Sequence, residues 1–356
     1  MTRLSKQLLS LVAAGALLAP AAFASSKESP HDTLMKSFQQ ANLWAGGPVK
    51  VSAKLRLPKA KPDGSDVTLD YTLSWAGPDK WRAEWTASGF DEVTVVNNGK
   101  LSYANTQPKP LVQLMQFEMA VAALDGFNPA GPYTLPPLDW DKAKMDSTKK
   151  KIGSVDAKCM AVGDPQETFC VDPANGHLLE MTMTVSGVDI SSFEYTDYAA
   201  VGSNSYPQTV TINYAKTLLE DGKITVSRDE KFPDSLFAPP EKSTTTDFPT
   251  CPDVDKNYTA PHVTKSVPAK MPDAARKAKK YGLVWVMANV GSDGAVSKVT
   301  VIGGDPDLTA AATDAVQQYK WSPYMRCGKA AAFQQVVVVP FTPAQKLPEE
   351  GVLPSR

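Results

Sequence analysis

Residues 282–304 read GLVWVMANVGSDGAVSKVTVIGG, and this stretch decides the fold of the C-terminal part of the 356-residue chain. Its two apolar runs, residues 283–290 and 296–302, are rich in β-branched side chains and are separated by Gly291-Ser292-Asp293-Gly294. Asp-Gly readily adopts the positive φ angles of a tight turn, whereas β-branched residues favour extended backbone. The stretch therefore predicts two strands that pair antiparallel as a hairpin.

Helix signals stand on both sides of this hairpin. Upstream, Pro272 suits the first position of a helix over residues 272–281, which has an acidic first turn and a basic last turn. Downstream, Asp305 can cap a second helix over residues 308–319, in which apolar residues recur at helical spacing. A valine-rich run over residues 333–341 then predicts a last strand. The order helix, strand, strand, helix, strand describes a small α+β unit.

The ordered combination of these features resembles the TonB C-terminal domain of periplasmic energy transducers, over residues 261–342. The matching positions are Pro272 with Ala275 and Arg276, Gly282 with Val284 and Val286, the Asp293-Gly294 turn, Ala311-Ala312 with Ala315-Val316, Trp321-Ser322-Pro323 and Gly328. Short linkers predict that the last strand returns beside the Asp293-Gly294 hairpin, at or near the edge of a three-stranded antiparallel sheet. The resemblance implies a small α/β-sandwich-type module. It also implies that this strand binds peptides of outer-membrane receptors by strand addition, through Gln335, Val336, Val337, Val338 and Val339.

The N-terminus has the three parts of a secretory signal. Arg3 and Lys6 precede an apolar run over residues 8–18, and Ala22-Phe23-Ala24 forms a small-residue cleavage site. We expect residues 1–24 to be removed and the mature protein to be periplasmic. The alternative is an uncleaved segment that anchors the chain in the inner membrane, although a spanning helix needs about 20 apolar residues and Pro20 interrupts this run.

Charge and motif content argue against several classes of function. The chain has 37 basic and 38 acidic residues, a formal net charge of -1, which argues against a nucleic-acid partner. The histidines, His31, His177 and His262, stand beside tail, turn or linker signals, and no metal-binding, phosphate-loop or nucleophile-elbow motif occurs. The sequence therefore predicts a protein without catalytic residues, metal or cofactor. Scattered carboxylates leave an enzyme as the weaker alternative.

Four cysteines lie in the predicted mature chain, and an exported protein favours disulfides. Cys159 and Cys170 stand on two short apolar runs separated by a turn, which favours a bridge within a hairpin. That pairing leaves Cys251, before the C-terminal module, and Cys327, before its last strand, as the second pair. The alternative is that the cysteines are buried free thiols.

The N-terminal two thirds of the chain show alternating strand patterns, at residues 51–57, 67–75, 80–86 and 93–96, which predict an antiparallel meander. Helices are expected near residues 32–43 and 111–124. Residues 32–240 resemble the half-barrel superfamily of periplasmic lipoprotein carriers that includes LolA. The shared features are Trp81-Arg82-Ala83-Glu84, Lys100-Leu101-Ser102-Tyr103 and Phe237-Ala238-Pro239-Pro240. We expect residues 241–260 to be a linker and residues 343–356 a disordered tail.

Three tryptophans are candidate contacts for an apolar ligand on the concave face of this half-barrel. Trp81 and Trp85 share the same side of one strand, and Trp75 lies on its neighbour. Ordinary core packing is the alternative, because large aromatic residues dominate cores. Two functions follow as hypotheses. The first is a periplasmic interaction protein linked to TonB-dependent outer-membrane transport, and the alternative is a periplasmic carrier of a lipid or other apolar ligand.

Overall fold

The computed structural model describes residues 28–59, 63–106, 112–128, 131–132, 145–162, 166–185, 188–214, 217–228, 230–248, 258–259 and 261–341. The predicted signal at residues 1–24, the predicted tail at residues 343–356 and Cys251 lie outside these ranges.

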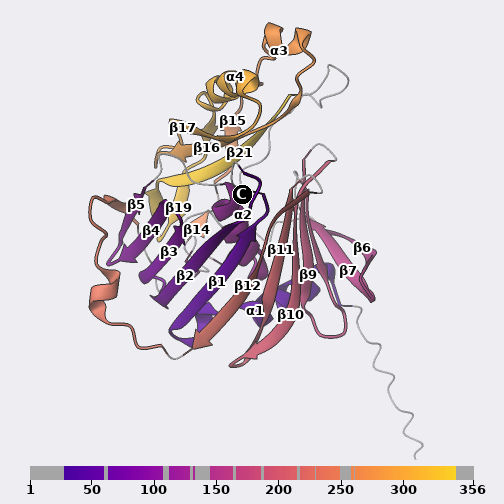
Figure 1. Cartoon of the computed structure of the whole chain (residues 1–356), viewed down its shortest axis with the longest axis vertical. Coiled ribbons are helices and arrows are strands. Elements are labelled where there is room, and N and C mark those ends of the chain that lie inside the picture. Colours follow the sequence, from indigo (N-terminus) through magenta and orange to yellow (C-terminus); the bar gives the residue numbers. More distant parts are fainter. Residues whose placement is uncertain are drawn as a thin grey trace, which may run out of the picture.

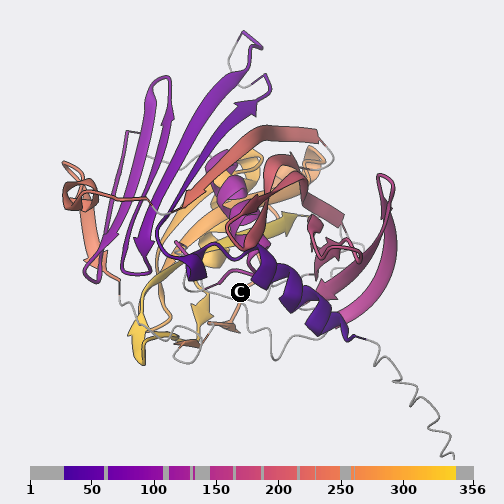
Figure 2. The same cartoon turned by 90° about the horizontal axis from the view of Figure 1, so that it is seen from below.

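Thirteen strands of the described chain form one large antiparallel sheet. In spatial order they are β13 (Thr244–Asp247), β5 (Lys100–Asn105), β4 (Phe90–Asn97), β3 (Lys80–Ala87), β2 (Val67–Gly77), β1 (Val49–Leu57), β12 (Thr217–Arg228), β11 (Asn204–Tyr214), β10 (Val188–Val201), β9 (Leu178–Val185), β8 (Gln166–Val171), β7 (Val155–Val162) and β6 (Met145–Ile152). The predicted meander is confirmed, because β1 to β5 are consecutive neighbours. The sheet is open and curved, as Figures 1 and 2 show, and we call it the half-barrel.

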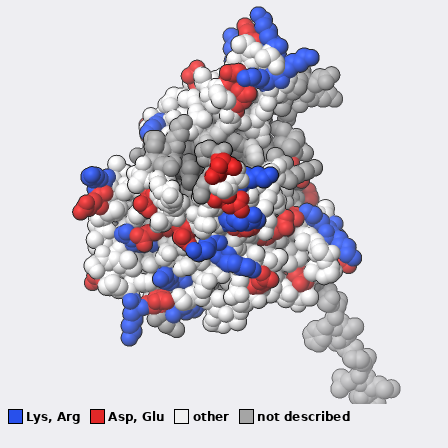
Figure 3. Space-filling model, viewed as in Figure 1, with Lys and Arg blue, Asp and Glu red and all other residues white. Residues whose placement is uncertain are grey.

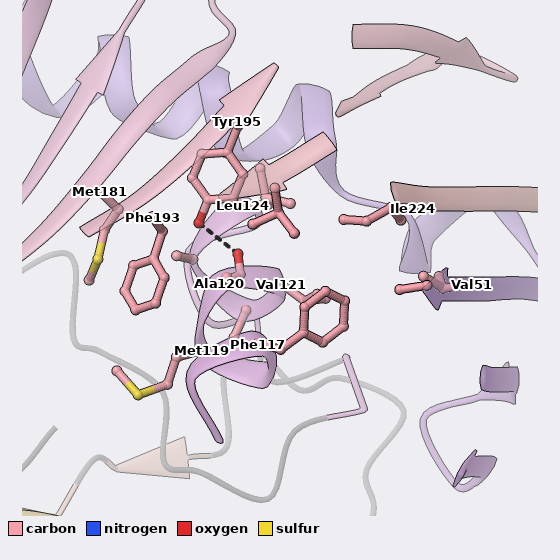
Figure 4. Close-up of a cluster of buried hydrophobic side chains, with 14 of the residues drawn as sticks. Val51, Phe117, Met119, Ala120, Val121, Leu124, Met181, Phe193, Tyr195 and Ile224 are labelled. Carbon is pink, nitrogen blue, oxygen red and sulfur yellow. Dashed lines mark hydrogen bonds between the residues drawn. The ribbon is translucent and has the colours of Figure 1, made fainter. Parts of the chain in front are cut away.

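Two helices pack against the concave face of the half-barrel, α1 (Pro30–Ala41) and α2 (Val112–Leu124). The side chain of Ser29 caps α1, which begins and ends two residues earlier than predicted. Buried apolar side chains occur all round α2, so the helix is enclosed by protein. Phe117, Val121 and Leu124 of α2 lie among the inward side chains of the strands, and the Tyr195 hydroxyl donates a hydrogen bond to the Ala120 carbonyl at 2.7 Å (Figure 4).

The segment predicted as a linker, residues 241–260, contains the strand β13. Residues Thr244–Asp247 pair antiparallel with β5 and thereby cover one edge of the half-barrel. The three consecutive threonines of this segment are β-branched and favour extended backbone. The polar composition of this segment predicts a linker, but the backbone of residues 244–247 pairs with β5.

The predicted bridge between Cys159 and Cys170 is confirmed. The two residues stand directly opposite each other on β7 and β8, and their sulfurs are bonded. Cys327 is also disulfide-bonded, and its predicted partner Cys251 lies outside the described residues.

Replacing both Cys159 and Cys170 by alanine should lower the free energy of unfolding by about 3 kcal/mol. The bridge closes a loop with a sequence separation of 11, so its loss increases the conformational freedom of the unfolded chain. Urea denaturation of the variant and of the oxidised parent measures the effect, with the parent after reduction as a control for the altered packing. An unchanged denaturation midpoint would contradict the prediction.

The C-terminal domain contains a three-stranded antiparallel sheet in the order β17 (Val296–Gly303), β16 (Gly282–Val290) and β21 (Phe333–Phe341). This arrangement confirms the predicted hairpin and the edge position of the last strand. Helix α4 (Pro306–Val316) packs on one face of the sheet, with Leu308 and Ala312 buried against Val286. Helix α3 (Asp273–Lys277) is shorter than the predicted helix over residues 272–281, because Lys279 takes a left-handed φ of 54°.

Shorter elements complete the described structure. Strands β14 (Tyr258–Thr259), β19 (Tyr324–Arg326) and β20 (Lys329–Ala331) form one small sheet, and β15 (Val263–Lys265) pairs with β18 (Lys320–Trp321). Single-turn helices occur at Trp44–Gly46 and Asp234–Phe237. In Figure 1 the C-terminal domain, coloured orange to yellow, stands at one end of the half-barrel.

Candidate functional site: the free edge of the last strand

Strand β21 is an edge strand. It pairs with β16 on one side, and within the described chain no strand pairs with its other side. An edge strand presents unpaired backbone N–H and C=O groups, which can bind an extended peptide.

Two observations show which backbone groups of β21 point to this free edge. Pro340 stands opposite Leu283 and has no N–H, as expected where the backbone nitrogen faces away from the neighbouring strand. The Ser297 hydroxyl of β17 donates to the Asn289 carbonyl at 3.0 Å, so the odd residues of β16 bond toward β17. The even residues of β16 therefore bond to β21, through the residues of β21 that stand opposite them.

The register then assigns the predicted peptide-binding residues to two groups. Gln335, Val337 and Val339 stand opposite even residues of β16 and bond to that strand. Val336 and Val338 share the parity of Pro340, so their N–H and C=O groups point to the free edge. In agreement, the Val336 carbonyl accepts a hydrogen bond from the Gln335 side chain at 3.1 Å rather than from β16.

The side chains of β21 are mostly committed to packing. Val337 and Val339 lie in the core under α4, whereas Val338 packs on the opposite face of the sheet. Gln335 is 8% exposed, and its side-chain oxygen has no hydrogen-bond partner in the described part of the chain. The edge therefore offers a peptide its backbone groups more than its side chains.

The face of the C-terminal sheet away from α4 contacts the half-barrel. Trp285 and Val338 belong to the same buried apolar cluster as the inward residues of the large sheet, with partly buried residues packed beside them: Leu283, Ile302 and Val336. The Trp285 indole N–H donates to the Tyr214 hydroxyl of β11 at 2.7 Å, and the two rings meet edge to face with centroids 5.6 Å apart. We call this face, formed by these five residues of the C-terminal domain, the docking face.

The predicted ligand-contact tryptophans lie in the core of the half-barrel. Trp75 and Trp81 stand directly opposite each other on β2 and β3, and Trp85 packs against Tyr71 with ring centroids 4.4 Å apart. All three are at most 4% exposed. The alternation of residues along the strands predicted the face that the tryptophans share. It did not predict the contact with Phe117 of helix α2, whose ring centroid lies 5.4 Å from that of Trp85.

Two carboxylates that the sequence did not single out approach this aromatic cluster. Glu118 of α2 accepts a hydrogen bond from the Trp85 indole at 3.3 Å. Desolvation by the surrounding protein and then the charge of Glu92 raise the pKa of Glu118 to about 7. Burial also raises the pKa of Glu92, although the Tyr103 hydroxyl donates to it at 2.9 Å. These residues are far apart in sequence, so no local pattern marked them.

Two histidine and serine pairs occur in the described chain. His177 Nε2 lies 2.9 Å from the Ser205 hydroxyl, and His262 Nδ1 lies 3.0 Å from the Ser322 hydroxyl. The nearby Asp172 carboxylate accepts bonds within its own turn, from the Ala174 N–H and the Asn175 amide. The His177 ring stacks on the Tyr198 ring, with centroids 3.9 Å apart.

Charged side chains of both signs are interspersed on the molecular face shown in Figure 3. This distribution agrees with the near-neutral net charge. In the described ranges, no helix combines the length and the apolar character required to cross a bilayer.

Several solved structures are similar to the N-terminal part. A LolA superfamily protein from Nitrosomonas europaea is 14% identical with a TM-score of 0.40, and the match covers 58% of this chain and 96% of that protein. A putative outer membrane lipoprotein-sorting protein domain from Vibrio parahaemolyticus is 11% identical with a TM-score of 0.38, covering 58% and 95%. A DUF1329 family protein from Desulfovibrio piger is 7% identical with a TM-score of 0.42, covering the same shares.

No curated protein sequence matches the chain. The C-terminal resemblance, by contrast, is confirmed with nearly the predicted boundaries: residues 268–343 match the model of the Gram-negative bacterial TonB protein C-terminal family.

Proposed function

We propose that this chain is a periplasmic, non-enzymatic interaction protein whose C-terminal domain binds short peptide segments of outer-membrane receptors by strand addition at β21. The observation that supports it most directly is the free edge of β21, where the backbone groups of Val336 and Val338 point away from β16. Residues 268–343 match a family of Gram-negative TonB C-terminal domains, which agrees with this partner class.

The periplasmic location is supported by the chemistry of the cysteines. The buried bridge between Cys159 and Cys170 persists in an oxidising compartment, and disulfides are rare in the reducing cytosol. The signal-like segment at residues 1–24 agrees with export.

Chemical-shift mapping tests the proposal. Isotopically labelled protein is titrated with synthetic peptides taken from the N-terminal segments of outer-membrane receptors, and calorimetry measures the affinity. We expect the largest shift changes at the amides of Val336 and Val338, with smaller ones along β16. Changes confined to the half-barrel strands, or the absence of binding by every peptide in the panel, would contradict strand addition at β21.

A second candidate function is a carrier of an apolar ligand in the half-barrel. It is favoured by the buried cluster on the concave face, where Trp75, Trp81 and Trp85 lie with α2 and the docking face. Solvent extraction of protein purified from the periplasm, followed by mass spectrometry, tests it. A lipid recovered in stoichiometric amount supports the carrier, whereas no lipid together with measurable peptide binding favours the interaction protein.

A further inference from the structure

We propose that the C-terminal domain is a lid on the half-barrel, and that the docking face must leave the concave sheet before an apolar ligand of the acyl-chain type can enter. This inference rests on the proposed carrier function of the half-barrel and assigns its regulation.

The C-terminal sheet is apolar on both faces, and each face has a different partner. On β16, Val284, Val286 and Ala288 point to α4, whereas Leu283 and Trp285 point to the half-barrel. A sheet with one face under its own helix needs no second cover to fold. The apolar second face is therefore a surface fitted to the concave sheet, and in the docked arrangement it occupies apolar area that a ligand would use.

The polar contact in this interface suits a reversible closure. The Trp285 indole and the Tyr214 hydroxyl satisfy each other at 2.7 Å when docked, and both can bond to water when separated. This hydrogen bond favours one docked orientation. Breaking it costs little free energy, because the indole N–H and the hydroxyl each bond to water after the domains separate.

A buried carboxyl lies on the same concave face. Glu220 of β12 stands opposite Ile212, two residues before Tyr214 on the same side of β11. Its side chain is fully buried, and within the described residues neither carboxylate oxygen has a hydrogen-bond partner. Burial of an unpaired carboxyl costs free energy, and water admitted to this face on opening would recover part of that cost.

The docking face is one part of the contact between the two domains, and the Arg326 guanidinium of β19 also lies over the Phe248 ring beside β13, at 4.2 Å. The docking face contributes five side chains, and two of them, Trp285 and Val338, are fully part of the buried cluster. Domain interfaces of limited size permit relative motion by default.

The test compares the parent chain with Trp285→Ala and Tyr214→Phe. The probe is a fluorescent fatty-acid analogue, and small-angle scattering reports the separation of the domains. Apparent affinity is the intrinsic affinity multiplied by the open fraction, so a mostly closed parent binds weakly. We expect Trp285→Ala to bind the probe at least about tenfold more tightly and to have a larger radius of gyration. Tyr214→Phe should also raise the probe affinity and the radius of gyration, by smaller amounts than Trp285→Ala does.

Controls separate the outcomes. Tyr281→Ala changes an exposed aromatic residue of the C-terminal domain that is not among the five residues of the docking face, and it should match the parent. Equal probe binding by the parent and Trp285→Ala would overturn the lid while leaving the carrier function standing. Domain separation without probe binding by any variant would overturn the carrier function, and the lid with it. Peptide titration of the same variants reports independently on β21.

Discussion

Replacing Val336 by proline should weaken peptide binding by on the order of tenfold to a hundredfold and leave the C-terminal sheet folded. The Val336 N–H points to the free edge, so proline removes a donor from the peptide but none from the pairing with β16. Calorimetry with the tightest peptide of the mapping experiment measures the loss, and circular dichroism checks the fold.

Two matched variants show that the backbone donor is responsible. Val336→Ala shortens the same side chain, keeps the N–H and should bind only modestly more weakly than the parent. Val337→Pro removes an N–H that faces β16 and should unfold the sheet rather than act on the peptide alone. A folded Val336→Pro protein that binds peptide as tightly as the parent would refute strand addition at this edge.

Replacing Glu220 by glutamine should raise the free energy of unfolding by about 1–3 kcal/mol at pH 8, and by less at pH 5. Burial raises the pKa of Glu220 well above its ordinary value of 4.5. The folded protein therefore holds this proton more tightly than the unfolded chain does. As the pH rises above about 4.5, the unfolded chain loses the proton first, which favours unfolding of the parent. Glutamine has no proton to lose and removes this pH dependence.

Urea denaturation at several pH values between 5 and 8, followed by tryptophan fluorescence, measures this difference. Glu194→Gln is the matched control, because Glu194 is an exposed glutamate on β10 and should show no comparable gain. A stability difference between Glu220→Gln and the parent that stays constant across this pH range would contradict the assignment of the penalty to ionisation of the buried carboxyl.

The hairpin and the edge strand of the C-terminal domain could be predicted from sequence because their signals are local. The Asp293-Gly294 turn and the β-branched runs on both sides specify which residues pair. The direction of each N–H along β21 is not a local property. It depends on the register with β16, and Pro340 becomes informative only when its partner Leu283 is known.

The half-barrel was predictable as alternating strands, but its interior was not. Parity placed Trp81 and Trp85 on one face, whereas the approach of Glu118 to Trp85 depends on how α2 lies across the sheet. Likewise, no sequence pattern indicated that Trp285 would leave the C-terminal core and bond to Tyr214. The near-continuous apolar run of residues 283–288 is typical of a strand buried on both faces, but it does not identify what covers the second face.

Because β21 carries the candidate peptide edge and also packs on the half-barrel, tension on a bound peptide has a defined mechanical route. Backbone hydrogen bonds between strands run nearly perpendicular to the strand axis, so a pull along an added strand loads the whole ladder in shear. From β21 the force passes to β16 and then, through Trp285 and Tyr214, into β11 and the large sheet. In the docked arrangement the half-barrel would anchor β21 against such a pull, with the indole-to-hydroxyl bond as one of the contacts that carry the load.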